Sequence, residues 1–300
     1  MRFILLNFIS LFIIMLLFVK DSSANDDTKL IANFNVTTAP GKKLKVNAYA
    51  GGVKIETWKQ NEVKVEVYGN ENAENYFTYT ANSDDEGVIV KSAVKSDFSN
   101  KKNFNINIEF KISVPENYNV DVVTGGGGIS IANLTGDVSL NTSGGGIKLS
   151  KIVGNVTGST SGGNLKYDNI VGNINSSTSG GNVKILNFLG NVNVSTSGGN
   201  MELEGTNGSV DASTSGGNIK LVYGGKNMGI DLNTSAGNIN VRVPEDFDAD
   251  ADLSTSLGNI NSDFAKVDKE MMSAKLKVRL NNGGNALKCV TSAGNISLTK

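Results

Sequence analysis

Four lysines recur at a fixed spacing and are the residues of this sequence best suited to binding chemistry. Each is the middle residue of an apolar-x-apolar triplet, so in an extended strand it points away from the side that its apolar neighbours occupy. A straight row of ammonium groups suits an anionic polymer such as an acidic polysaccharide, lipopolysaccharide or teichoic acid. The same row would also serve as a solvated face that resists aggregation. The predicted ligand-binding residues are Lys148, Lys166, Lys184 and Lys220, with Glu202 breaking the row.

The side chains that most enzymes need are missing from the chain. It has no histidine and a single cysteine, Cys289. This excludes a Ser-His-Asp triad, a Cys-His pair, a histidine-ligated zinc site and an internal disulfide. Basic and acidic side chains balance at 28 and 29, so no net charge draws the chain to nucleic acid. We therefore predict that the protein is not an enzyme and has no catalytic residue, metal or cofactor.

One enzymatic alternative rests on carboxylates. Polysaccharide-active β-helix enzymes use clustered acids, and Asp248, Asp250 and Asp252 alternate along one predicted strand. Three carboxylates would then share a face. The surrounding repeats are too short and uniform for the long loops that build a catalytic cleft, so a glycan-cleaving enzyme stays the alternative and not the main prediction.

The lysines are placed by an internal repeat. Thr-Ser-Gly-Gly-Asn begins at Thr160, Thr178, Thr196 and Thr214, each 18 residues after the last. A period of this length is typical of a solenoid, whose repeats bury a core only by stacking. The sequence thus predicts an all-β fold, a parallel β-solenoid (β-helix-like) with about 18 residues per coil. Two strands are evident per period, and Ile170-Val171 is a candidate for a third short strand.

Each residue type in the repeated motif has a predicted structural role. Alternation turns the threonine inward, and we expect the buried hydroxyls to bond to one another along the stack. The glycine pair predicts a tight corner that needs positive φ or close approach between coils. The asparagine after it predicts an amide ladder. The motif is therefore interpreted as a corner and not as a phosphate-binding loop.

The segments outside the repeats predict three parts. Residues 1–24 have the pattern of a signal peptide, with Arg2, an apolar run and a Ser-Ser-Ala site, and a membrane anchor retained in the mature protein is the alternative. Residues 25–118 form an N-terminal segment: a loosely held leader over 25–43, a degenerate first coil, and an irregular antiparallel insertion over 69–118. Residues 119–300 form the solenoid. The stretches 275–280 and 286–290 flank Asn281–Asn285, which predicts a hairpin inserted into one long coil.

The order of these motifs is similar to that of the bacterial putative-adhesin family of β-strand repeats. The resemblance covers nearly the whole chain after residue 24. The family implies an exported β-solenoid and supplies no catalytic residues, and "adhesin" there describes an architecture and not a mechanism. The residues that carry the resemblance are Gly52–Ile55, Trp58, Glu62–Val65, Ile112–Pro115, the repeated Thr-Ser-Gly-Gly-Asn and Thr291–Leu298.

These observations predict an exported, non-enzymatic structural or adhesin-like β-solenoid of the bacterial cell envelope. Its place would be the periplasm, the cell surface or the extracellular space, with no membrane span once the signal peptide is removed. The expected partners are surface glycans or other anionic envelope polymers, and not nucleic acid. A periplasmic scaffold that binds envelope proteins through residues 69–118 is a further alternative. The oligomeric state is left open.

Overall fold

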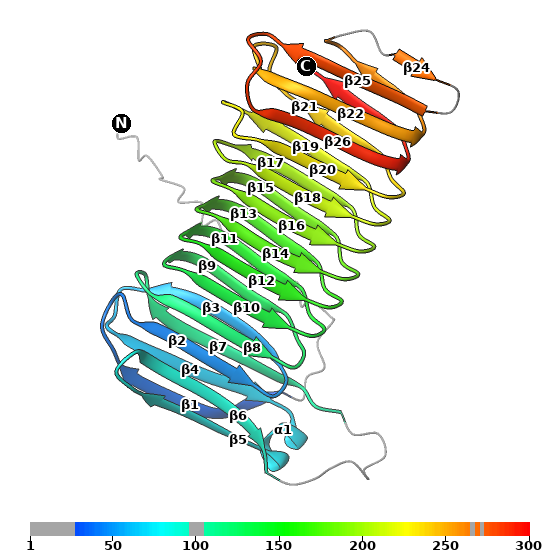
Figure 1. Cartoon of the computed structure of the whole chain (residues 1–300). Coiled ribbons are helices and arrows are strands. Elements are labelled where there is room, and N and C mark those ends of the chain that lie inside the picture. The colour runs from blue at the N-terminus through cyan, green and yellow to red at the C-terminus, as the bar shows by residue number, and fades with distance from the viewer. Residues whose placement is uncertain (1–27, 96–104, 265–267, 271–272) are drawn as a thin grey trace, which may run out of the picture.

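Two long sheets face each other along the whole molecule, and the chain passes from one to the other in every coil (Figure 1). The computed structural model describes residues 28–95, 105–264, 268–270 and 273–300, and for 268–270 and 273 the backbone alone. Over these residues, sheet A has 13 strands and sheet B has 14. The core lies between the sheets as one continuous apolar cluster from Leu44 to Leu298.

The repeats supply one strand to each sheet per coil. Every strand pairs in parallel with its counterpart in the next coil, with Thr142, Thr160 and Thr178 in register. This confirms the predicted β-solenoid and its 18-residue period. The repeat strands of sheet B are β8 (Asn119–Thr124), β10 (Val138–Thr142), β12 (Val156–Thr160), β14 (Ile174–Thr178), β16 (Val192–Thr196), β18 (Val210–Thr214) and β20 (Ile230–Thr234). Those of sheet A are β9 (Ile129–Thr135), β11 (Ile147–Val153), β13 (Leu165–Val171), β15 (Val183–Leu189), β17 (Met201–Thr206), β19 (Ile219–Gly224) and β21 (Ile239–Arg242).

The predicted third strand is part of the sheet A strand. In β13, Ile170 and Val171 continue the ladder of Leu165–Asp168 after one residue, Asn169, with φ of 57°. Asparagine tolerates this left-handed backbone better than most residues, and Asn133 and Asn187 occupy the same place in their coils, with Lys151 in the coil between Asn133 and Asn169. The left-handed residue bends the strand without ending it, so each coil has two strands and not three.

The threonine column is buried as predicted, but its hydrogen bonds differ from the prediction. Thr178 donates its hydroxyl to the carbonyl of Gly163 in the preceding coil at 2.8 Å, and accepts from the amide of Gly181 in its own corner at 3.2 Å. Thr160 and Thr196 bond in the same way. The expected threonine-to-threonine bonds were therefore wrong, because each hydroxyl donates to a corner carbonyl of the preceding coil instead. Each threonine joins two coils through their backbones.

Local departures from the repeat in the core compensate one another. Tyr167 is fully buried, and its hydroxyl lies 3.1 Å from Oγ of Ser176. Gly158 and Ser176 occupy the same column of sheet B in consecutive coils. The coils on either side of them have Leu140 and Val194 at this position. A Cβ on Gly158 would lie only 2.3 Å from the tyrosine oxygen. Gly158 leaves space for the side chain of Tyr167, and Ser176 forms a hydrogen bond with the tyrosine hydroxyl. The buried tyrosine oxygen therefore has a hydrogen-bond partner.

We predict that Gly158→Ala lowers the free energy of unfolding by about 2 kcal/mol, as overpacking of a full core typically does. In a Tyr167→Phe background the same change should cost at least about 1 kcal/mol less, because the clashing oxygen is gone. Chemical denaturation of the four proteins of this double-mutant cycle measures the coupling. Equal costs of Gly158→Ala in both backgrounds would refute the proposed fit.

The N-terminal strands belong to the same two sheets. β2 and β3 pair in parallel with β8 and β9 and so form the predicted first coil, and β5 with β6, β1 with β4 and β4 with β7 pair antiparallel. The predicted loose leader over 25–43 was wrong for residues 29–37, because these form β1, in which Ala32, Phe34 and Val36 alternate toward the core. The elements are β1 (Lys29–Thr37), β2 (Lys43–Ala48), β3 (Gly52–Trp58), β4 (Glu62–Gly69), α1 (Glu71–Tyr76), β5 (Phe77–Ser83), β6 (Gly87–Val94) and β7 (Ile108–Pro115).

The C-terminal coil is inserted between two earlier layers. In sheet B, β26 lies between β20 and β22, and in sheet A, β27 lies between β21 and β23. The predicted hairpin was wrong, since β25 pairs antiparallel with β22 and not with β26. The corner at Thr291–Asn295 stacks on the previous regular corner, and the less regular coil ends the stack. The strands are β22 (Ala249–Leu257), β23 (Ile260–Ser262), β24 (Asp268–Glu270), β25 (Ser273–Leu280), β26 (Ala286–Ala293) and β27 (Ile296–Thr299).

Over the described residues, no helix has the length and apolar character to cross a membrane. The predicted signal peptide at residues 1–24 lies outside the described residues.

Candidate functional site

The four predicted lysines stand on the outer face of sheet A. Lys148 pairs with Lys166 on the next strand, and Lys166 with Lys184, so the three form an unbroken column across β11, β13 and β15. Lys220 follows on β19, with Glu202 of β17 between it and Lys184. Neighbouring strands lie about 4.8 Å apart, which sets the spacing of the column. We call Lys148, Lys166, Lys184, Glu202 and Lys220 the lysine row.

Glu202 connects the far part of the lysine row instead of interrupting it. Its carboxylate accepts a hydrogen bond from Lys184 and another from Lys220 at 3.3 Å. The hydrogen bond from Lys184, followed by that from Lys220, holds the pKa of Glu202 below its ordinary value of 4.5. These three side chains form a surface ion triad with one net positive charge, so the charge of this end is largely neutralised.

The other end of the lysine row keeps its charge. Lys148 and Lys166 are exposed and form no ion pair with any side chain that the structure describes. Two ammonium groups about 5 Å apart repel each other by nearly 1 kcal/mol in water. An anion placed between them would relieve that repulsion. Lys148 and Lys166 are therefore the part of the row best suited to bind a ligand.

A hollow that the sequence did not predict adjoins this end. Ser130 of β9 occupies the row position next to Lys148, and Lys54 of β3 follows it. A depression of about 280 Å³ opens here and is lined by Lys54, Ser130 and Lys148 together with the corner glycines Gly128 and Gly146. Lys54 pairs with Glu56 at 2.7 Å. The triplet Ile129-Ser130-Ile131 would have revealed Ser130 as a member of the row.

Two asparagine ladders hold the strands of the row in register. In the predicted ladder, the amide N–H of Asn182 donates to Oδ1 of Asn164 at 2.8 Å, and Asn200 repeats this contact one coil on. A second ladder lies at the opposite corner and was missed, although a Gly-Asn or Gly-Asp pair precedes those strands every 18 residues. It includes Asn119, Asp137, Asn155, Asn173 and Asn191.

The acids of the enzymatic alternative are each engaged with a separate partner. Asp250 pairs with Arg279 at 3.5 Å and Asp252 with Lys277 at 3.1 Å, both across the β22–β25 contact. Asp248 accepts from the amide of Asn282 at 2.9 Å. Asp250 and Asp252 share the outer face as predicted, but here they serve to join two strands.

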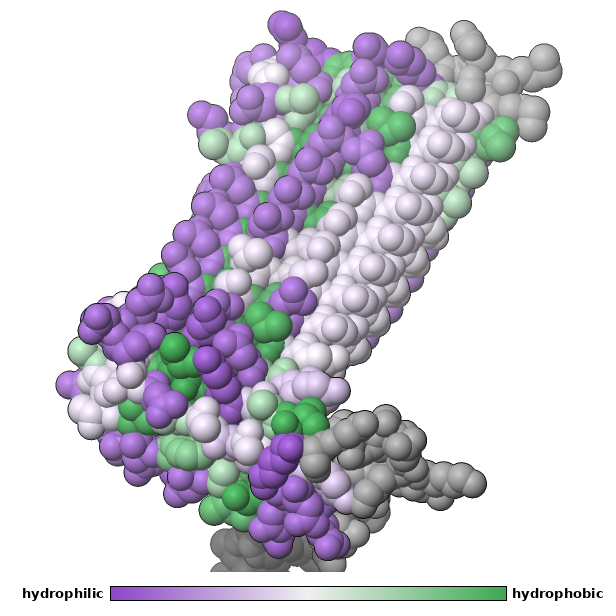
Figure 2. Space-filling model, turned by 60° about the horizontal axis from the view of Figure 1, so that its bottom comes forward, coloured by the Kyte–Doolittle hydropathy of each residue, from purple (hydrophilic) through white to green (hydrophobic). Residues whose placement is uncertain are grey.

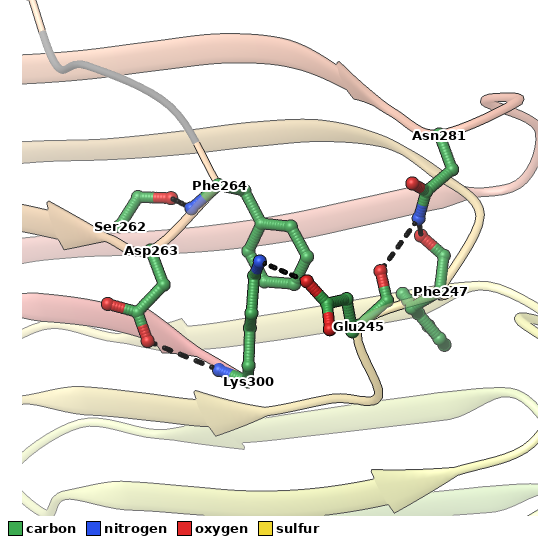
Figure 3. A network of polar contacts seen from close by, with 7 residues as sticks. All are labelled: Glu245, Phe247, Ser262, Asp263, Phe264, Asn281 and Lys300. Carbon is green, nitrogen blue, oxygen red and sulfur yellow. Dashed lines mark hydrogen bonds and ion pairs between the residues drawn. The ribbon is translucent and has the colours of Figure 1, made fainter.

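Polar contacts around Lys300 close the C-terminal layers (Figure 3). Its ammonium group donates to Glu245 at 2.8 Å and lies 5.3 Å from the centre of the Phe264 ring. Its amide donates to Asp263 at 3.3 Å, and Asn281 bonds the carbonyls of Glu245 and Phe247. These residues come from separate links between strands, so the network has a structural role in joining the inserted coil to its neighbours.

The regular stacking turns each repeated position into a stripe. Figure 2 shows neutral and hydrophilic residues aligned in bands that run along the length of the stack. Because each coil repeats the previous one in register, a surface side chain of one coil recurs at the same position in the next coils, at constant spacing. Such a surface is suited to a ligand that is itself repetitive.

Comparisons with known proteins place the chain in a family. No curated protein matches the sequence. Similar solved structures include "a putative adhesin" from Bacteroides fragilis, with 17% identity over 90% of this chain and 97% of that one and a TM-score of 0.46. Others are "a putative cell adhesion protein" from Clostridium sporogenes (14%, 89% and 98%, TM-score 0.24) and a "putative lipid binding protein" from Parabacteroides distasonis (12%, 92% and 98%, TM-score 0.40). These descriptions apply to those proteins. The model of one family matches residues 41–299, and the chain therefore belongs to the Toastrack DUF4097 family.

Proposed function

We propose that this protein is an exported, non-enzymatic module of the bacterial envelope that binds anionic polymers along the lysine row. The observation that carries the proposal is the pair Lys148 and Lys166, which lie side by side in register without an ionic partner among the described residues. Export is supported by the leader pattern in residues 1–24. An acidic polysaccharide is the ligand class that matches a straight row of like charges at constant spacing.

Binding would rest on several weak contacts and not on one deep pocket. An exposed ion pair contributes about 0.2–1 kcal/mol and weakens as salt screens it. Contacts repeated along a polymer add through avidity, since the second contact forms within the same complex. Affinity would therefore come from the constant spacing of the coils, and not from a preformed cavity.

Retention on immobilised polygalacturonate, with neutral galactan as the control matrix, tests the proposal. We expect Lys148→Gln/Lys166→Gln to lower the affinity about tenfold, because two contacts of about 0.7 kcal/mol each amount to that factor. Lys184→Gln/Lys220→Gln removes the same net charge and should have a smaller effect, since these lysines already bind Glu202. Equal losses in both variants, or equal retention of the native protein on galactan, would refute the assignment.

Glu202→Gln should strengthen binding to polygalacturonate about threefold to tenfold. The change frees Lys184 and Lys220, so that the row carries four unpaired positive charges. Acidification should act in the same direction on the protein: the lowered pKa keeps Glu202 charged until the pH falls below 4.5, and protonation then releases both lysines. Isothermal titration at neutral pH compares the variant with the native chain. A weaker or unchanged affinity of Glu202→Gln would contradict this role of the carboxylate.

A further inference from the structure

The two ends of the stack are finished differently. At the C-terminal end, sheet A stops at β23, a strand of three residues, and in sheet B the layers beyond β22 include β25 with Lys275, Lys277 and Arg279. Short strands and charges of this kind discourage pairing with another sheet. At the N-terminal end, sheet A stops at β1, which has nine residues and no charge or proline from Leu30 to Thr37. The N-terminal edge therefore lacks the protection that the C-terminal edge has.

Along its outer edge, β1 has a regular set of backbone groups that pair with no strand among the residues that the structure describes. The amide of Thr38 donates to the carbonyl of Asn61 at 3.0 Å, and β1 then pairs with β4 without a break from Ala32 to Thr37. In an antiparallel pair, residues alternate between those bonded to the partner strand and those directed away from it. The amide and carbonyl groups of Asn33, Asn35 and Thr37 thus point away from β4, along the outer edge of sheet A.

The core is incompletely covered at the same end. Ala32, Phe34 and Val36 of β1 pack against the apolar core but are only partly buried. Tyr79 and Ala81 of β5, the last strand of sheet B, are also partly buried, and β5 lies against β1. A strand added to the outer edge of β1 would cover these partly buried side chains. It would also form hydrogen bonds with the outward-pointing backbone groups of β1.

We propose that this edge is an interface with a second copy of the chain, in which the two β1 strands pair antiparallel across a two-fold axis. With Asn35 opposite Asn35 of the second copy, Asn33 faces Thr37, and all three outward-pointing residues fall into hydrogen-bonded pairs. The same register sets Phe34 opposite Val36, so apolar side chains meet on the core side. All these pairs lie within the regular part of β1, after its irregularity near Ile31. The strand is therefore complementary to itself in both backbone and side chains.

The length of chain before β1 favours a second copy over the protein's own N-terminus as the occupant. Removal of the predicted leader at residue 24 leaves four residues, 25–28, before β1, too few to turn back and pair along it. Lys29, the one charged residue of β1, pairs with Glu74 at 2.6 Å. The dimer would join two A sheets end to end and present two lysine rows, but the inference does not depend on what those rows bind.

Sedimentation equilibrium of the exported chain tests the interface. The native protein should be a dimer, and Asn35→Pro should raise its Kd at least about tenfold, because proline removes an outward donor and the two-fold axis presents that loss in both copies. The fold should survive, because this amide is not bonded to β4, and circular dichroism with the thermal midpoint checks that. A native protein that sediments as a monomer, or a dimer that Asn35→Pro leaves unchanged, would overturn the proposal.

A cysteine crosslink gives an independent readout of the register. Residues in a hydrogen-bonded antiparallel pair have Cα atoms about 5.5 Å apart, within the range that a disulfide spans. Asn35→Cys should therefore form a covalent dimer on mild oxidation, whereas Asn175→Cys on the outer face of sheet B should not. The native Cys289 is buried and does not compete. Equal crosslinking of both variants, or none at Asn35→Cys, would contradict the two-fold pairing.

Discussion

Gly181→Ala is expected to lower the free energy of unfolding by about 3 kcal/mol, the upper part of the range for overpacked sites. A Cβ on Gly181 would lie 1.9 Å from the carbonyl oxygen of Gly163 in the preceding coil. That oxygen cannot move aside without cost, because it accepts the hydroxyl of Thr178. The second glycine of the corner is thus required by the close approach of two backbones. Its φ is not in the left-handed region, so backbone conformation alone would allow alanine.

The first glycine of the same corner is the matched control. Gly180 would carry a Cβ with no described atom within 4 Å, so Gly180→Ala should change stability by less than about 0.5 kcal/mol. Urea denaturation of the two variants, monitored by circular dichroism, measures the difference. Equal costs of the two alanines would show that close contact between coils does not explain the second glycine of the motif.

Deletion of residues 286–300 should destabilise more of the chain than the deleted part. The deletion removes β26 and β27, which lie between the coil of β20 and β21 and the coil of β22 and β23. Without this inner layer, β22 loses the strand β26 with which it pairs, and β22 and β25 are cut off from the rest of sheet B. The apolar faces of two coils are then exposed to solvent. We expect β22, β23 and β25 to lose their protection, while the repeats from β8 to β18 keep their own nearest-neighbour contacts.

Hydrogen exchange resolved by segment distinguishes this outcome from simple loss of an end. In the shortened chain, amides of β22 and β25 should exchange within the range of unprotected peptides, and those of β12 to β16 should remain as slow as in the native protein. Continued protection of β22 would mean that the last coil is the outermost layer, in conflict with the observed strand order.

The repeat could be predicted from sequence because its physics is local. An 18-residue period, inward alternation and a Gly-Gly-Asn corner each follow from neighbouring residues, and the solenoid, the buried threonines and the asparagine ladder were confirmed. The hydroxyl partner of Thr178 was not accessible in this way. It depends on where the carbonyl of Gly163 lies after stacking, and a sequence pattern does not contain that position.

The order of layers at the C-terminus was beyond the sequence for a different reason. Thr291-Ser-Ala-Gly-Asn has the same corner chemistry wherever it stacks, so its pattern does not say which coil lies next to it. For the candidate site, the outward direction of the lysines followed from alternation. The ion triad of Glu202 with Lys184 and Lys220 could not be predicted without the register between strands. That register places Glu202 between the two lysines, where it pairs with both.

If the stack binds through one group repeated at constant spacing, as we propose, its affinity must depend on the length of the ligand. The affinity of the native chain for oligogalacturonates of increasing length should be measured at fixed salt. We predict a rise of at least about tenfold between oligomers that span one lysine and those that span several, because later contacts form within the complex. An affinity that is the same at every length would contradict the claim.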